Sequence, residues 1–255
     1  MFMKLATRRG FETGTKLSEV VVPEKMKIRL STGRKYFDGA LGGKGMTPSV
    51  SMLYTGTPGA GKTTMMLDVC DNWTQQAHGG IALFVTAEES LYQLKMHAER
   101  LKLKLNDRFR VGEENKVKQV LKDADTLRLT HPGQPILLVF DSLQTLDDEK
   151  YKDGHITSNT PVVCASLITD WCKEHFMNAV MIGQVNKDGK MAGKEKLKHL
   201  VDTKLHLDVE TKDAETRGLR KLMTEKNRFG GADYIHYLQL MEDRFKLIGK
   251  KGFND

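Results

Sequence analysis

An α/β protein with a mostly parallel central sheet, helices on both faces and antiparallel C-terminal strands is the fold that this sequence predicts. Short apolar runs typical of buried strands alternate with stretches typical of helices through most of the chain. Near the C-terminus the alternation ends in two strand-like stretches, 217–226 and 234–240, which indicate an antiparallel hairpin. The 255 residues correspond to one large domain, or to one domain with short extensions.

The individual elements follow from local patterns. Strands are expected at 50–54, 81–86, 136–140, 179–183 and 204–209, and helices at 64–77, 88–105, 113–128 and 160–175. The last helix begins at Thr160 and Pro161, a capping hydroxyl followed by a proline in the first turn. Residues 147–158 and 186–198 are polar and are expected to be loops. Residues 1–29 show little periodicity and form either an arm that docks on a neighbouring subunit or a frayed terminus, so the domain is expected to cover 30–255.

Composition narrows the class of protein. The net charge of +7 favours polyanionic partners. Cys70, Cys164 and Cys172 form no C-x-x-C pair, so we expect them to pack as small apolar residues and not to form a zinc site or a disulfide framework. No apolar run approaches the roughly 18 residues that a membrane helix needs, and the N-terminus has no apolar signal core. These features predict a soluble, cytoplasmic protein with no membrane partner.

A phosphate-binding loop is the most specific feature of the chain. Between the first expected strand and the helix that follows, the chain fits the pattern G-x-x-x-x-G-K-[ST] with Gly56-Thr57-Pro58-Gly59-Ala60-Gly61-Lys62-Thr63. Glycines let several backbone N–H groups converge on a phosphate, and the helix, which contains Thr64, points its positive N-terminus at the same place. We expect these residues, Thr64 included, to bind a nucleotide, with Lys62 on the β- and γ-phosphates and the Thr63 hydroxyl on Mg²⁺. The alternative, a glycine-rich turn without a ligand, does not account for the strand before it and the helix after it.

Acidic residues follow two of the expected strands. Asp141 ends the apolar run 136–140, and ligands of open α/β sheets bind beyond the carboxyl ends of the strands. Asp141 is therefore our candidate, with Thr63, to hold Mg²⁺, here through water. Glu88 and Glu89 follow the run 81–86, where a carboxylate can position the water that attacks a phosphate, and we favour Glu88 as catalytic. The dipole of the next helix would also favour acids there, and the two interpretations are compatible.

Polar and basic residues complete the candidate site. Gln184, after the run 179–183, is either a sensor of the γ-phosphate or an ordinary polar residue at a strand end. The loop 186–198 either contacts nucleic-acid phosphates or is simply solvated. Its five lysines are Lys187, Lys190, Lys194, Lys196 and Lys198. In the pentad Lys226-Asn227-Arg228-Phe229-Gly230, two cations can bind phosphate in their own or a neighbouring subunit, although composition alone favours a basic surface cluster.

The order of these motifs resembles the RecA-like ATPase family, and its bacterial RadA/Sms branch most closely. The resemblance runs from about residue 29 to 247, and the pentad spelled K-N-R-F-G is distinctive of that branch. Besides the phosphate loop and the pentad, its landmarks are Ser31-Thr32-Gly33, Leu41-Gly42-Gly43, Val85-Thr86-Ala87-Glu88-Glu89-Ser90, Phe140-Asp141-Ser142-Leu143-Gln144-Thr145, Gly183-Gln184-Val185-Asn186-Lys187-Asp188-Gly189, Ala192-Gly193 and His199-Leu200-Val201-Asp202. The sequence departs from the branch in showing neither its zinc finger nor its Lon-like domain, and in carrying Gln184 where the branch usually has His.

The resemblance implies a RecA-like P-loop NTPase core and a DNA-dependent ATPase motor that uses ATP and Mg²⁺. It implies that Glu88 is catalytic, that Lys226 and Arg228 act on the neighbouring subunit's nucleotide, and that loops 147–158 and 186–198 line a DNA channel. Family members form rings, typically hexamers, or filaments on single-stranded DNA, and the RadA branch moves branched recombination intermediates. The alternatives are a DnaB-like ring helicase and a nucleotide-switched scaffold with little dependence on DNA.

Overall fold

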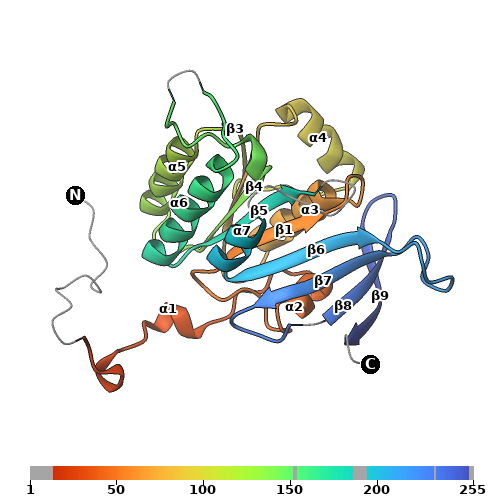
Figure 1. Cartoon of the computed structure of the whole chain (residues 1–255), viewed down its shortest axis with the longest axis horizontal. Helices are drawn as coiled ribbons and strands as arrows, with labels where there is room; N and C mark the ends of the chain where they lie inside the picture. The colour runs from red at the N-terminus through yellow and green to blue at the C-terminus, as the bar shows by residue number, and fades with distance from the viewer. Residues whose placement is uncertain (1–13, 152–153, 186–193, 233, 253–255) are drawn as a thin grey trace.

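The predicted mixed sheet is present in the computed structural model, which describes residues 14–151, 154–185, 194–232 and 234–252 (Figure 1). The described chain forms a nine-stranded sheet in the order β3-β2-β4-β5-β1-β6-β7-β8-β9, parallel from β3 to β6 and antiparallel from β6 to β9. The strands are β1 (Ser51–Gly56), β2 (Ile81–Thr86), β3 (Phe109–Glu113), β4 (Ile136–Asp141), β5 (Asn178–Gln184), β6 (Thr203–Val209), β7 (Arg220–Asn227), β8 (Tyr234–Leu240) and β9 (Phe245–Gly252).

Two hydrophobic cores lie on the two faces of the sheet. Successive side chains of a strand point to opposite faces. Met52 and Tyr54 of β1 accordingly pack in one core, while Leu53 packs in the other. Because both faces are covered, the central strands read as continuous apolar runs instead of alternating ones.

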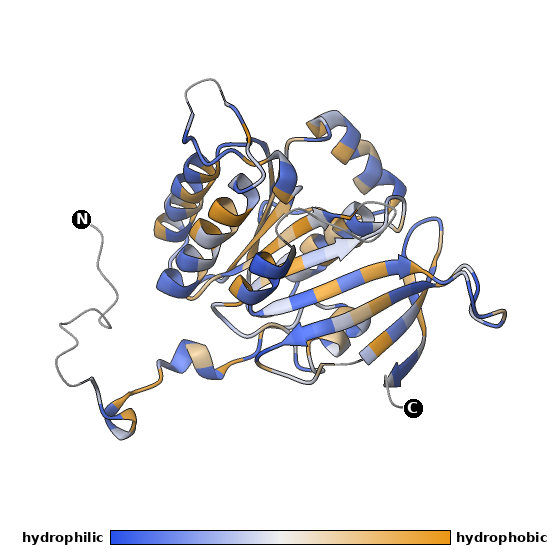
Figure 2. Ribbon diagram, in the orientation of Figure 1, coloured by the Kyte–Doolittle hydropathy of each residue, from blue (hydrophilic) through white to orange (hydrophobic). Residues whose placement is uncertain are grey.

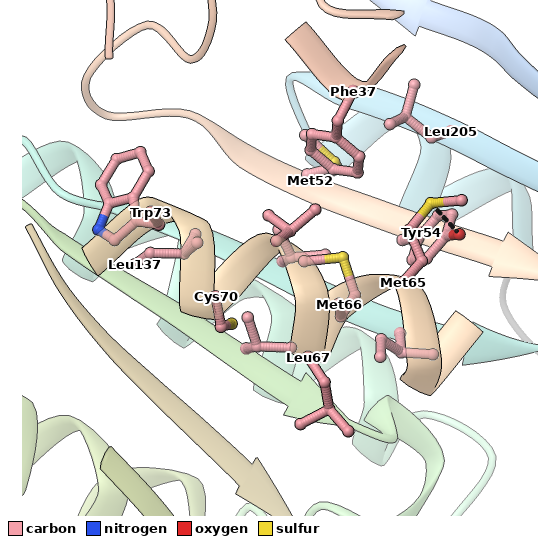
Figure 3. Close-up of a cluster of buried hydrophobic side chains, with 14 of the residues drawn as sticks. Phe37, Met52, Tyr54, Met65, Met66, Leu67, Cys70, Trp73, Leu137 and Leu205 are labelled. Atoms are coloured by element: carbon pink, nitrogen blue, oxygen red, sulfur yellow. Dashed lines mark hydrogen bonds between the residues drawn. The ribbon is translucent and has the colours of Figure 1, made fainter. Parts of the chain in front are cut away.

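Helices supply the other half of each core. One face is covered by α2 (Lys35–Ala40), α3 (Lys62–Thr74) and α4 (Leu91–Arg100), and the other by α5 (Val117–Thr130), α6 (Thr160–His175) and α7 (Lys194–Leu200). Apolar residues concentrate on the central strands and on the helix faces turned toward them (Figure 2). Figure 3 shows α3 in this packing, with Met65, Met66 and Trp73 along the helix and with the Tyr54 hydroxyl 3.0 Å from the Met65 sulfur. The helix that follows the phosphate loop is thereby fixed by burial along most of its length.

The expected helix 88–105 is wrong at both ends. Ser90 caps α4 by accepting from the Gln93 N–H, and Gln93 in turn accepts from the Ser90 N–H, so the helix begins only at Leu91. After Arg100 the chain takes positive φ angles at Lys102 and Leu105 and enters β3, a strand that the sequence reading missed. The following helix, expected from 113, therefore starts at Val117.

Two further elements differ from expectation. The loop expected over 186–198 ends earlier, because α7 begins at Lys194 and buries Leu197 in the core that α6 shares. The final strand β9 was also missed, since its side chains are mostly exposed and carry lysines, a composition that suits a sheet edge but gives no alternating pattern.

Residues 14–29 lead away from the body of the domain (Figure 1). They contain a 3-10 turn (η2, Leu17–Glu19) and one short helix (α1, Glu24–Lys27), and none of the described residues before Leu30 is buried. The Lys25 ammonium lies 3.9 Å from the centre of the Phe176 ring, which anchors the base of this segment. Whether it docks on a neighbouring subunit stays a prediction.

Two remaining expectations concern single features. Cys70, Cys164 and Cys172 are buried, as expected of packing residues, and burial raises the pKa of the Cys164 thiol to about 12. Within the described ranges, no helix is long and apolar enough to cross a membrane.

Candidate nucleotide-binding site

The ends of four adjacent parallel strands form the candidate site. In the strand register, Gly56 of β1 lies beside Gln184 of β5, and Asp141 of β4 lies beside Thr86 of β2. All four residues end or nearly end their strands, so the phosphate loop, the candidate metal ligand and the candidate catalytic segment lie along one edge of the sheet. This is the crevice at which open α/β sheets bind ligands.

The phosphate loop has the backbone that its glycines predict. Gly59 and Gly61 have φ angles of 75° and 100°, in the left-handed region that glycine adopts without strain. Gly56 is needed for a different reason, since a Cβ there would lie 2.2 Å from the Leu207 carbonyl oxygen of β6. Helix α3 begins at Lys62, so its N-terminus points into the loop, as anion binding requires.

Lys62 folds back onto its own loop. Its ammonium donates to the carbonyl oxygens of Gly56 at 3.0 Å and Thr57 at 3.1 Å. Burial lowers the pKa of Lys62, and the nearby carboxylates of Asp141 and Glu88 oppose that effect. A phosphate in the loop would replace two neutral acceptors with a charged one, which makes a stronger hydrogen bond.

Thr63 and Asp141 meet, as a shared cation requires. The Thr63 hydroxyl donates to Asp141 Oδ2 at 2.6 Å. Burial raises the pKa of Asp141 to about 6, and the Glu88 and Glu89 carboxylates add to that effect, while the Thr63 hydrogen bond and Lys62 oppose it. A buried carboxylate that lacks sufficient positive charge is well suited to a divalent cation, so the two residues fit Mg²⁺.

Glu88 is held by side chains from three strand ends. The Thr86 hydroxyl accepts from the N–H groups of Glu88 at 3.2 Å and Glu89 at 3.1 Å, which shapes the turn after β2. The Ser142 hydroxyl donates to Glu88 Oε1, and Gln184 Nε2 donates to Oε1 at 3.0 Å and to Oε2 at 2.8 Å. The Glu89 side chain instead faces α4, with its Oε2 atom 3.3 Å from Nδ1 of His97. The structure therefore brings Glu88 and Gln184 together and turns Glu89 toward α4.

Lys226 and Arg228 lie away from this edge. Lys226 pairs with Lys204 in the antiparallel ladder, and Thr203 pairs with Met52, so the pentad lies level with the N-terminal half of β1, with β6 between them. Met52 and Gly56 are four residues apart, which corresponds to about 13 Å along a strand. The two cations are accordingly remote from the chain's own phosphate loop.

Both cations contact the end of α7 in this structure. The Lys226 ammonium donates to the carbonyl oxygens of Lys198 and Val201, each at 2.6 Å. Arg228 Nη1 donates to Asp202 Oδ1 at 3.0 Å, and Nη2 donates to the His199 carbonyl at 3.3 Å. Cations at a helix C-terminus satisfy carbonyls that lack partners in the helix. The pentad therefore anchors α7, which carries three of the five candidate DNA-binding lysines.

The five candidate DNA-binding lysines are only partly described. Lys187 and Lys190 lie outside the described residues, and Lys194 begins α7. Lys196 is exposed on that helix and Lys198 is half-buried.

Sequence reasoning missed two residues that hold the phosphate loop. Asp208 of β6 accepts from the Thr57 hydroxyl at 3.0 Å, and Arg220 of β7 donates through Nε to the Ala60 carbonyl at 3.3 Å. Both brace the phosphate loop from the neighbouring strands. Only the pairing of β6 with β1 and of β7 with β6, which no local pattern reveals, brings them there.

Comparison with known proteins identifies the relationship. No family model matches the chain. The DNA repair protein RadA of Escherichia coli (strain K12) is 35% identical over 235 residues, which cover 91% of this chain and 47% of that protein. The RadA of Haemophilus influenzae is 36% identical over 234 residues, with the same coverage of 91% and 47%. The chain is a homologue of these RadA proteins. It spans about half the length of these RadA relatives, as their 47% coverage states.

Solved structures agree on the fold of this RadA-like core. One solved ATPase domain matches with a TM-score of 0.72 at 14% identity, over 89% of this chain and 93% of that one. A KaiC-like protein from Pyrococcus horikoshii OT3 matches with a TM-score of 0.68 at 16% identity, over 87% and 99%. The predicted resemblance to RadA and the predicted P-loop fold are both confirmed.

Proposed function

We propose that this chain is a DNA-dependent ATP hydrolase of the RecA/RadA type. In this proposal it binds single-stranded or branched DNA in the cytoplasm and uses ATP hydrolysis in recombination, branch migration or repair. The observation that carries the proposal is the meeting of Lys62, the Thr63–Asp141 pair and Glu88 at one edge of the sheet. It supplies a phosphate cradle, a cation site and a carboxylate within one crevice.

Each group has a separate task in the proposed hydrolysis. Lys62 leaves its two carbonyl partners and binds the β- and γ-phosphates. Thr63 and Asp141 would hold Mg²⁺, whose charge offsets the charge of the phosphates. Glu88 orients a water molecule and accepts its proton as the water oxygen bonds to the γ-phosphorus and the bond from that phosphorus to the β–γ bridging oxygen breaks. Gln184, bonded to both oxygens of Glu88, transmits the state of the nucleotide to the lysine-rich loop that follows it.

DNA binding is supported by charge and by relatives. The chain has a net charge of +7, and the loop after Gln184 carries lysines that can neutralise phosphates. The RadA proteins that the chain resembles are described as DNA repair proteins. We assign the contact with the DNA backbone to Lys187, Lys190, Lys194, Lys196 and Lys198.

Assembly follows from the position of the pentad. Because Lys226 and Arg228 lie remote from the chain's own phosphate loop, we propose that they complete the nucleotide site of a neighbouring subunit in a ring, a hexamer by family resemblance, or in a filament. Mixing two inactive variants tests this arrangement. Lys62→Ala lacks the phosphate ligand and Arg228→Ala lacks the neighbour's cation, so a mixture regains activity at interfaces where intact halves meet. No recovery on mixing would contradict a role in the neighbouring site.

The catalytic assignment is tested by Glu88→Gln. We expect this variant to bind ATP as the wild type does and to lose at least about a hundredfold in kcat, within the range of general acid–base catalysis. The matched control is Glu99→Gln on α4, whose exposed carboxylate pairs only with Lys95 in the described contacts and should leave kcat unchanged. Turnover that survives in Glu88→Gln would refute the assignment.

The DNA assignment is tested by a paired charge removal. Lys187→Ala combined with Lys190→Ala should weaken binding to single-stranded DNA and lower the slope of log affinity against log salt by about 1.4, or roughly 0.7 per lost phosphate contact. Lys118→Ala combined with Lys122→Ala removes the same charge from the exposed side of α5 and should change neither quantity. An unchanged slope in the first pair would favour a nucleotide-switched scaffold, while unwinding of duplex DNA by the protein alone would favour a ring helicase.

A further inference from the structure

The side chain of Gln144 continues the sheet where strand β4 ends. The ladder between β4 and β5 reaches Asp141 beside Ile182, after which the chain leaves the sheet and forms a 3-10 turn (η3, Leu143–Thr145). Strand β5 runs on to Gln184, whose other neighbour is Gly56 of β1. The β4 side of Gln184 would therefore lack a backbone partner.

Gln144 supplies that partner from its side chain. Its Nε2 donates to the Gln184 carbonyl at 2.9 Å, and its Oε1 accepts from the Gln184 N–H at 3.3 Å. A carboxamide carries one acceptor and a donor group, as a peptide unit does, so it can replace the missing stretch of backbone. Two bonds to one residue fix its orientation as well as its position.

The same residue, Gln184, holds Glu88 through its side chain. A shift of the Gln184 backbone would move Nε2 away from Oε1 and Oε2 of Glu88, which it contacts at 3.0 Å and 2.8 Å. Ser142, two residues before Gln144, holds Glu88 directly, and the Thr145 hydroxyl donates to the Ser142 carbonyl at 2.8 Å. The segment 142–145 thus reaches the carboxylate both directly and through Gln184.

We propose that Gln144 is a positioning residue for ATP hydrolysis that acts on Glu88 through Gln184. This inference rests on the proposed function and adds to it a residue whose described side-chain hydrogen bonds go to the Gln184 backbone. An ordinary packing role for a half-buried glutamine is the alternative.

Gln144→Met tests the proposal because it keeps the length of the side chain and removes both hydrogen bonds. We expect kcat for ATP to fall roughly tenfold, the effect of losing about two uncharged hydrogen bonds, while ATP affinity stays within about twofold. Gln144→Glu provides a second variant in case the first does not fold, since it keeps the acceptor for the Gln184 N–H but sets an anion against the Gln184 carbonyl. It should be impaired to a similar extent. Gln119→Met on α5, where the side chain bonds only to Asp123 in the described contacts, is the control.

A double-mutant cycle separates positioning from packing. If Gln144 acts through Gln184, Gln144→Met adds nothing to kcat in a Gln184→Met background. Hydrogen exchange gives a readout without turnover: the Gln184 amide of the nucleotide-free protein should exchange at least about tenfold faster in Gln144→Met, with unchanged exchange in the centre of β5. Unchanged kcat, additive losses in the cycle, or an unchanged Gln184 amide would each overturn the inference.

The two proposals fail in different ways. Wild-type turnover that does not respond to DNA would refute the DNA dependence, while the cycle, measured without DNA, would still decide the role of Gln144. Conversely, DNA-stimulated turnover that Gln144→Met leaves intact would refute this inference alone.

Discussion

Asp141→Asn should make the protein without nucleotide or Mg²⁺ more stable, although it removes a metal ligand. Burial raises the pKa of Asp141 from 3.8 to about 6, so the folded state binds a proton more tightly than the unfolded state. The stabilising contribution of the protonated Asp141 carboxyl group to the free energy of unfolding is therefore complete only below pH 3.8, and it is lost as the pH rises through about 6. Two pKa units correspond to about 3 kcal/mol, which is the penalty for the ionised form that asparagine avoids.

Urea unfolding in EDTA, at about pH 7.5 and about pH 5, measures this effect. At the higher pH we expect the free energy of unfolding of Asp141→Asn to exceed that of the wild type by about 3 kcal/mol, and at the lower pH by about half as much, because the wild-type carboxyl group is then mostly protonated. Asp123→Asn, on the exposed side of α5, should change stability by less than about 0.5 kcal/mol at either pH. The reasoning would be refuted if Asp141→Asn were less stable than the wild type at the higher pH. It would also be refuted if the difference in the free energy of unfolding were the same at both pH values.

Two further substitutions test how the phosphate loop is built. Gly56→Ala places a Cβ 2.2 Å from a backbone oxygen that cannot move freely, so it should lower the free energy of unfolding by at least about 3 kcal/mol. The control Gly112→Ala, where a Cβ has nothing within 4 Å, should change that free energy by about 1 kcal/mol or less. Equal effects of the two substitutions on the urea midpoint would contradict this geometric argument. Arg220→Met removes the hydrogen bond to the Ala60 carbonyl and should weaken ATP binding about fivefold in an equilibrium titration, which corresponds to the loss of one hydrogen bond. The control Arg217→Met, at an exposed residue nearby, should leave the ATP affinity unchanged. A wild-type affinity in Arg220→Met would show that the phosphate loop keeps its shape without this hydrogen bond.

Much of this architecture could be predicted because strong local signals determine it. The phosphate loop with its flanking strand and helix, the strand ending in Asp141 and the turn carrying Glu88 each depend on a few neighbouring residues. Because parallel strands end at one edge, their assembly into one crevice also followed from the sequence. The resemblance to RadA required only the order of these motifs.

The features that escaped prediction depend on contacts between distant segments. Strands β3 and β9 are edge strands whose exposed side chains give no apolar pattern, and α7 is defined by the burial of Leu197. Arg220 and Gln144 act on backbone atoms 160 and 40 residues away, which no local spacing can reveal.

The central claim is that this chain hydrolyses ATP in response to DNA, and steady-state hydrolysis with and without single-stranded DNA at two salt concentrations tests it most directly. The account predicts clear stimulation by DNA that fades as salt rises, because lysine contacts with phosphates release counterions. Slow turnover that is the same with and without DNA at both salt concentrations would contradict it.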